Sequence, residues 1–96
     1  MNIELVARDV SVTPDIQERI EKKIEKMLEH RNKDIPVRVL VSESRGRTQA
    51  QITLTIMGKD VVGAAEDKTV MAAFDAALDK ADRQVKKIFE KVTDKR

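Results

Sequence analysis

The residues of this sequence whose types and spacing could form a binding site are basic side chains at helical spacing. Lys80, Arg83, Lys87 and Lys91 step along the chain by three, four and four positions, so they share one face of a helix. A row of positive side chains binds phosphate groups by charge, and it releases the counterions that surround a nucleic acid. We predict that Arg83, Lys87 and Lys91 lie nearly opposite the apolar stripe of this helix and point away from the sheet.

A second basic band falls on an earlier helix, and Lys86 adds a further base to the later one. The band on the earlier helix consists of Arg19, Lys22, Lys23 and Lys26. The acids of the same helix form a separate band on the other flank of its apolar stripe, namely Glu18, Glu21, Glu25 and Glu29. Helices that use charge for stability place opposite signs four residues apart, and Glu18–Lys22 is the main such pair that we identify. Two interpretations stay open: a surface for a polyanion, or ion pairs between neighbouring helices and ordinary solvated faces.

The total charge of the chain hides this distribution. The 96 residues contain 19 bases and 17 acids, for a formal net charge of +2. From Lys80 to Arg96, however, there are seven bases and three acids, so the surplus lies at the C-terminal end. A chain of this length is typical of one domain, and we expect residues 1–96 to form a single domain.

Composition argues against most catalytic and metal sites. The chain has no cysteine and one histidine, His30, which rules out a thiol nucleophile, a disulfide framework and a multi-histidine zinc site. Ser42 and Ser44 have no histidine other than His30 that could complete a catalytic triad. The three glycines are isolated and form no phosphate-binding loop. We therefore expect no enzyme, no cofactor, no metal and no small-molecule substrate. Arg45 and Arg47 in a predicted turn offer possible additional phosphate contacts, although a solvated turn is the plainer interpretation.

The pattern of apolar residues predicts the elements that would position these side chains. Thr13-Pro14-Asp15 has the residue types that open a helix, and apolar residues at helical spacing extend that helix to about Arg31. Gln49 to Ile56 alternates polar and apolar side chains, which is typical of a strand with one buried face. The remaining predicted elements are strands over 2–8, 37–42 and 61–65, turns over 44–47 and 57–60, and a long helix from about Asp67.

The order of these elements predicts the fold class. A β-α-β unit forms a right-handed crossover with parallel strands, and the two turns then give antiparallel neighbours. Because the third strand offers one apolar face, both helices must cover that face. We predict an α+β, β-α-β-β-β-α two-layer sandwich, with a four-stranded mixed sheet and both helices packed on one face. Gly63 weakens the short fourth strand, which suits an edge position or a bulge.

With this order in hand, the sequence resembles the short ribosome hibernation factors, the family of ribosome-associated inhibitor A and the hibernation-promoting factor, also known as sigma-54 modulation proteins. The resemblance covers nearly the whole chain. It is carried by Val12-Thr13-Pro14, by Lys23-Ile24-Glu25-Lys26-Met27, by Ala65-Glu66, by Met71-Ala72-Ala73-Phe74-Asp75 and by Leu78-Asp79-Lys80-Ala81-Asp82-Arg83-Gln84-Val85. The chain departs from the family at Thr69-Val70-Met71, where the family usually has Asp-Met-Tyr, and at His30-Arg31, where aromatic residues are common.

The resemblance implies a protein that acts by occupying a binding site rather than by catalysing a reaction. Members of this family sit on the small ribosomal subunit, in the channel for mRNA and tRNA, and silence translation under stress or in stationary phase. Carried over by position, the family's basic residues fall on Lys23, Lys26, Lys80, Arg83, Lys87 and Lys91. Together with the charge bands, this gives the predicted rRNA-binding set of Lys22, Lys23, Lys26, Lys80, Arg83, Lys86, Lys87 and Lys91.

Our leading hypothesis is a cytoplasmic translation inhibitor that binds small-subunit rRNA, monomeric when free and without a membrane partner. The alternative is a protein-interaction module that uses its sheet edge or polar sheet face, suggested by Leu40 on the polar face and by the weak fourth strand. Binding to an anionic membrane surface is a third and weaker option, because the apolar stripes are needed for the core.

Overall fold

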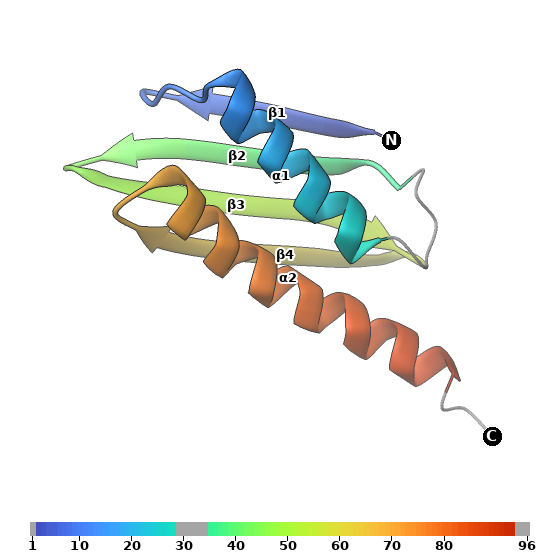
Figure 1. The fold of residues 1–96 in the computed structure, drawn as a ribbon. Coiled ribbons are helices and arrows are strands. Elements are labelled where there is room, and N and C mark those ends of the chain that lie inside the picture. The colour runs from blue at the N-terminus through green and yellow to red at the C-terminus, as the bar shows by residue number, and fades with distance from the viewer. Residues whose placement is uncertain (1, 29–34, 94–96) are drawn as a thin grey trace.

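The chain folds into one four-stranded sheet with two helices on one of its faces (Figure 1). The computed structural model describes residues 2–28 and 35–93, and for residues 91–93 it describes the backbone alone. The elements are β1 (Ile3–Arg8), α1 (Pro14–Met27), β2 (Val37–Ser44), β3 (Arg47–Ile56), β4 (Lys59–Asp67) and α2 (Val70–Thr93). This is the predicted β-α-β-β-β-α order.

The strands lie in the sheet in their sequence order, β1-β2-β3-β4. β1 runs parallel to β2, with Leu5 opposite Val39, and the two later pairs are antiparallel. The helices lie side by side and run in the same direction, with α1 over β1 and β2 and α2 beside β4 (Figure 1). The predicted mixed sheet and two-layer architecture are confirmed.

The core lies between the helices and the inner face of the sheet. Every second residue of the central strands is buried: Val37, Val39 and Val41 from β2, and Thr48, Ala50, Ile52, Leu54 and Ile56 from β3. Ile20 and Ile24 of α1 and Phe74 of α2 cover these strands and are fully buried. Burying a side chain as large as Phe74 stabilises the fold by about 1.5–3 kcal/mol. The apolar periods of strand and helix therefore meet in one core, as the sequence pattern predicts.

Two tight hairpins connect β2, β3 and β4. Arg45 and Gly46 have φ angles of 55° and 77°, and Met57 and Gly58 have φ angles of 52° and 76°. Positive φ at both central residues is the conformation of a two-residue turn whose twist matches that of the flanking strands. The predicted four-residue turns are therefore shorter, and β4 is longer than the predicted 61–65, because Lys59 and Asp60 already pair with β3.

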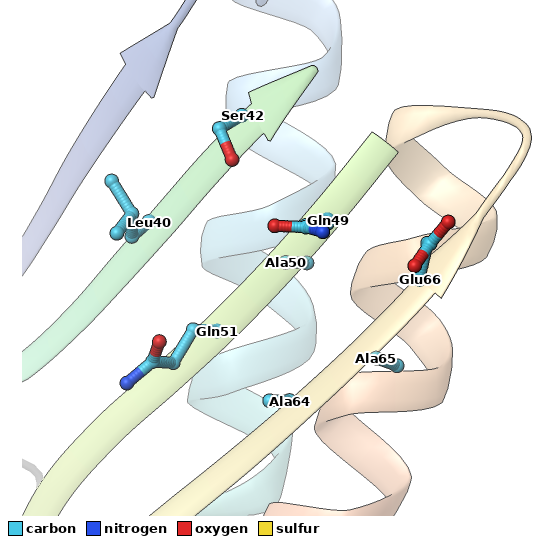
Figure 2. Close-up of a pocket in the computed structure, with 8 residues that line it drawn as sticks. All are labelled: Leu40, Ser42, Gln49, Ala50, Gln51, Ala64, Ala65 and Glu66. Atoms are coloured by element: carbon cyan, nitrogen blue, oxygen red, sulfur yellow. The ribbon is translucent and has the colours of Figure 1, made fainter. Parts of the chain in front are cut away.

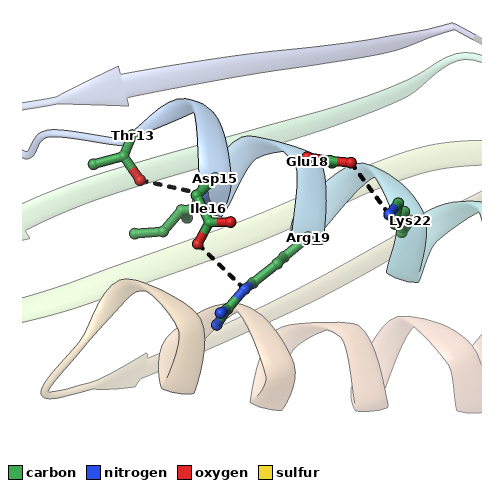
Figure 3. Close-up of polar contacts among 6 residues, drawn as sticks. All are labelled: Thr13, Asp15, Ile16, Glu18, Arg19 and Lys22. Atoms are coloured by element: carbon green, nitrogen blue, oxygen red, sulfur yellow. Dashed lines mark hydrogen bonds and ion pairs between the residues drawn. The ribbon is translucent and has the colours of Figure 1, made fainter.

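α1 begins as predicted and ends earlier than predicted. The Thr13 hydroxyl accepts a hydrogen bond from the Ile16 backbone N–H at 3.2 Å, and Pro14 occupies the first helical turn (Figure 3). The helix ends at Met27, where the backbone N–H of Leu28 still bonds to carbonyls of the last turn. The predicted end at Arg31 is therefore too late, and His30 and Arg31 lie outside the described residues.

Gly63 has a different role from the one that the sequence suggests. β4 is an edge strand, as predicted, yet it pairs with β3 on both sides of Gly63, which lies opposite Ile52. A Cβ atom at Gly63 would collide with the carbonyl oxygen of Ala77 and approach the backbone nitrogen of Ala81 to 2.8 Å. Glycine is needed here because the backbone of α2 packs directly against β4.

Candidate nucleic-acid interface

The side chain of Gln84 fastens α2 to the free edge of β4. Its Oε1 atom accepts a hydrogen bond from the Val62 backbone N–H at 3.2 Å, and its Nε2 atom donates to the Val62 carbonyl at 2.6 Å. We call these two bonds the Gln84 clamp. One turn earlier, Lys80 Nζ donates to the Ala64 carbonyl at 2.9 Å. An edge strand normally leaves such groups open to another chain, so α2 closes this part of the edge with its own side chains.

Lys80 and Lys87, two members of the basic row of α2, therefore lie along the edge of the sheet. Lys80 reaches the backbone of β4, and Lys87 lines a shallow depression together with Lys59 and Asp60 of that strand. Arg83 has a side chain that is 77% exposed. Arg83, Lys87 and Lys91 were predicted to point away from the sheet, and this is wrong for Lys87, because the clamp brings its side of the helix against β4. We call Lys59, Lys80, Arg83 and Lys87 the β4 flank.

The bases of both helices are better paired than the sorted bands suggest. Four of them bind an acid one turn earlier on the same helix: Arg19 to Asp15 at 3.5 Å, Lys22 to Glu18 at 3.2 Å, Arg83 to Asp79 at 3.0 Å and Lys86 to Asp82 at 3.1 Å. Figure 3 shows the two pairs on α1. The sequence identified Glu18–Lys22 as the main pair of this kind, and the structure adds the other three. Each such exposed pair contributes about 0.3–0.5 kcal/mol.

The flank of α2 that faces α1 is where the two helices neutralise each other. Lys23 Nζ lies 3.0 Å from Asp75 Oδ1, so the basic flank of one helix meets the acidic flank of its neighbour. Asp82 follows Asp75 by seven residues and shares its face. This is the interhelical pairing that the sequence left open as an alternative. We call Lys23, Asp75, Asp82 and Lys86 the α1 flank.

The predicted binding residues are thus divided among different environments. Lys26, Lys80 and Lys87 form no ion pair with any residue in the described ranges, and neither does Lys59, which the sequence did not predict. Lys22, Lys23, Arg83 and Lys86 each have a carboxylate partner, and the side chain of Lys91 lies outside the described residues. Sequence reasoning missed Lys59, which fell in a predicted turn, and Gln84, whose spacing of four from Lys80 was a usable signal.

Arg45 and Arg47 belong to another part of the molecule. Arg45 is exposed in the β2–β3 turn, and Arg47 Nε bonds to Glu66 Oε2 at 2.6 Å. Arg47 and Glu66 lie on neighbouring strands, at exposed positions that alternate with the residues facing the core, so they belong to the sheet face turned away from the helices. The structure therefore does not bring these arginines together with the basic residues of α2.

The outer sheet face is hollowed where its side chains are short. Leu40, Ser42, Gln49 and Gln51 line this hollow together with small residues of β4 (Figure 2). Leu40 is half-buried rather than exposed. The hollow offers amides, a hydroxyl and apolar surface, and its carboxylate, Glu66, is already paired with Arg47. This face is close to electrically neutral, unlike the β4 flank.

The described residues show neither a membrane helix nor a cluster of metal ligands. Over these residues, neither α1 nor α2 combines the length and apolar character that a membrane crossing requires. Within the same ranges, no three acidic or histidine side chains gather closely enough to hold a metal ion.

Comparison with known proteins identifies the family. Residues 3–93 match the family described as sigma 54 modulation protein / S30EA ribosomal protein. The chain belongs to this family. A ribosome hibernation promoting factor from Pseudomonas putida is 33% identical over 91 residues, which cover 95% of this chain and 89% of that protein. The factor of the same name from Azotobacter vinelandii is 30% identical, over 95% of this chain and 85% of that protein.

Two solved structures share the fold. The N-terminal domain of Thermus thermophilus Protein Y superposes with a TM-score of 0.82 at 29% identity, over 92% of this chain and 99% of that domain. A ribosomal subunit interface protein from Coxiella burnetii superposes with a TM-score of 0.79 at 18% identity, over 92% of this chain and 97% of that one. The predicted fold class and the predicted family resemblance are both confirmed.

Proposed function

We propose that this chain is a ribosome hibernation factor that silences translation by occupying the mRNA and tRNA channel of the small ribosomal subunit. Two relatives that cover nearly the whole chain are named ribosome hibernation promoting factors, which supports ribosome association and hibernation. The observation that carries the rRNA contact is the β4 flank, where basic side chains line one edge of the molecule. The proposed action is occupancy, and it requires no bond to be made or broken.

Phosphate groups of rRNA fit the β4 flank better than they fit the other surfaces. Lys59 and Lys87 have no carboxylate partner among the described residues, so a phosphate does not need to displace one. Lysine and arginine contacts with phosphate carry no base specificity, and they weaken as salt rises. The near absence of aromatic residues in the chain agrees with recognition of the backbone rather than stacking on bases.

We assign the predicted residues different weights. Arg83 and Lys87 form the centre of the proposed surface, Lys80 and Lys86 border it, and Lys91 continues the row along the sequence. On α1, Lys26 is the strongest candidate, because Lys22 and Lys23 are already bound to carboxylates. Arg45 and Arg47 are not part of this surface. The proposal treats residues 1–96 as a single ribosome-binding domain of the cytoplasm.

Cosedimentation with ribosomes tests the proposal. We expect the wild-type chain to pellet with ribosomes at about 50 mM salt and to dissociate as the concentration approaches about 200 mM. The double substitution Arg83→Glu with Lys87→Glu reverses the charge of both side chains. It should weaken binding about tenfold or more, because several phosphate contacts become repulsive. Circular dichroism checks that the variant still folds.

The matched control reverses the same charges elsewhere. Arg45→Glu with Lys68→Glu also replaces one arginine and one lysine, at exposed positions beyond the other end of β4. We expect this control to pellet like the wild type. Equal loss in both variants would show that net charge governs binding, and no loss in either would disprove the assignment of the β4 flank.

The structure weakens the alternative of a protein-interaction module at the β4 edge. Gln84 and Lys80 already occupy three backbone groups of that edge. The opposite edge strand, β1, carries exposed Glu4 and Arg8, and charges of this kind discourage strand addition. We accordingly infer that the free protein is a monomer, and light scattering of the purified chain tests that inference.

A further inference from the structure

A shallow depression on the β4 flank is built from a strand and a helix together. It is lined by Lys59 and Asp60 at the start of β4, and by Gln84, Lys87 and Ile88 of α2. Lys59 follows directly after the tight turn at Met57 and Gly58. The depression therefore combines a side chain outside both helices with the basic row of α2.

The Gln84 clamp sets the position of both lysines. Lys87 lies three residues after Gln84 on the helix, and Lys59 lies three residues before Val62 on the strand. Because α2 and β4 run in opposite directions (Figure 1), both lysines lie on the same side of the clamp. The close contact of Gly63 with Ala77 and Ala81 prevents the helix from sliding along the strand. The two ammonium groups are thus attached to one rigid unit.

The charge of the depression favours an anion. Lys59 and Lys87 have no ion-pair partner among the described residues. The carboxylate at its border, that of Asp60, accepts a hydrogen bond from the Thr55 hydroxyl at 2.9 Å, and Asp60 projects to the outer face of the sheet with Thr55. Two positive groups and one partly engaged negative group leave an excess of one positive charge, which matches a single phosphodiester.

We propose that Lys59 and Lys87 together bind one phosphate of the RNA backbone. This inference rests on the proposed function and deepens it, because it assigns one RNA group, a single phosphate, to two named residues of the β4 flank. Lys59 then positions the start of β4 against RNA, and the Gln84 clamp keeps the backbone positions of the two lysines at a fixed separation. The contact is independent of base sequence.

Neutral substitutions at the two ends of β4 test this proposal. We expect Lys59→Gln to weaken ribosome binding about threefold at low salt and to reduce the slope of log affinity against log salt by about one. Lys68→Gln, the control, removes a lysine that is likewise exposed and lies just past the other end of the same strand, and it should change neither quantity. In the double variant with Lys87→Gln, the losses should be less than multiplicative, because the two lysines share one phosphate.

A short single-stranded RNA separates failure of this proposal from failure of the proposed function. We expect NMR titration with a ten-nucleotide RNA of mixed sequence to shift the resonances of Lys59 and Lys87, and the Lys59→Gln substitution to remove the shift at Lys87. If the wild type pellets with ribosomes and Lys59→Gln behaves like Lys68→Gln, the shared phosphate site is wrong and the function stands. If the wild type does not pellet, the function is wrong, and the RNA titration still decides the phosphate site.

Discussion

The two flanks of α2 carry similar numbers of charges and use them differently. On the α1 flank, Asp75 binds Lys23 of the neighbouring helix and Asp82 binds Lys86. On the β4 flank, Lys80 bonds to a strand carbonyl, and Lys87 has no carboxylate partner among the described residues. The difference shows that the neighbours of a charge, rather than the charge itself, decide whether it is available to a ligand.

This difference has an energetic side. Ion pairs of the α1 flank are exposed and contribute between zero and about 1 kcal/mol each. Their chief effect is to neutralise charge where the two helices face each other, so that a polyanion gains little by lying there. Contacts on the β4 flank fix the backbone of a helix to the backbone of a strand, and they determine where the remaining positive groups lie. Three experiments test this contrast.

The largest effect is expected at Gly63. Gly63→Ala places a Cβ atom against the backbone of Ala77 and Ala81, so that α2 must move away from β4. We expect the free energy of unfolding to fall by about 1–3 kcal/mol, measured by urea denaturation, together with weaker ribosome binding. Ala64→Val, which adds bulk to the outer face one residue along, should change stability far less. Equal stability losses in the two variants would contradict the close packing of α2 on β4.

A smaller effect is expected at Gln84. Gln84→Ala removes both bonds of the clamp, and we expect a loss of about 1–2 kcal/mol with faster hydrogen exchange at the Val62 amide. Gln49→Ala is the matched control, because Gln49 lies on the outer sheet face in the hollow of Figure 2. Unchanged exchange at Val62 in the Gln84 variant would show that the clamp does not protect the edge.

The smallest effect is expected on the α1 flank. A double-mutant cycle with Lys23→Ala and Asp75→Ala should give a coupling of about 0.5 kcal/mol that disappears at high salt, because both side chains are nearly half exposed. Thermal or urea denaturation at two salt concentrations measures it. We also expect Lys23→Ala to weaken ribosome binding less than Lys87→Ala does. The reverse order would remove the contrast between the flanks.

The fold was predictable because its strongest signals are local. The alternation from Gln49 to Ile56 identifies a half-buried strand, and Thr13-Pro14 identifies the start of a helix. The element order then leaves few topologies. The exact turns were less predictable, because positive φ at Arg45 and Met57 is unusual for residues with a side chain.

The candidate site was predictable in composition and less so in arrangement. Helical spacing shows that Lys80 and Lys87 share a face, but it does not show which neighbour that face meets. That depends on how far α2 overhangs the sheet, which the Gly63 contact and the Gln84 clamp determine together. Lys59 joins the site through the β3–β4 turn, and no periodicity marks it. The pairs Asp79–Arg83 and Asp82–Lys86 could have been predicted from their spacing of four residues.

The clamp also has a consequence for the order of events during synthesis. β2, β3 and β4 are joined by two-residue turns, and hairpins of this kind form within microseconds once both strands are available. Gln84 lies 22 residues after Val62, so the ribosome adds it seconds later, at typical rates of about 5–20 residues per second. For that interval the nascent sheet exposes an unprotected edge that can pair with other chains. Docking of α2 therefore protects the β4 edge of the growing chain from pairing with other chains.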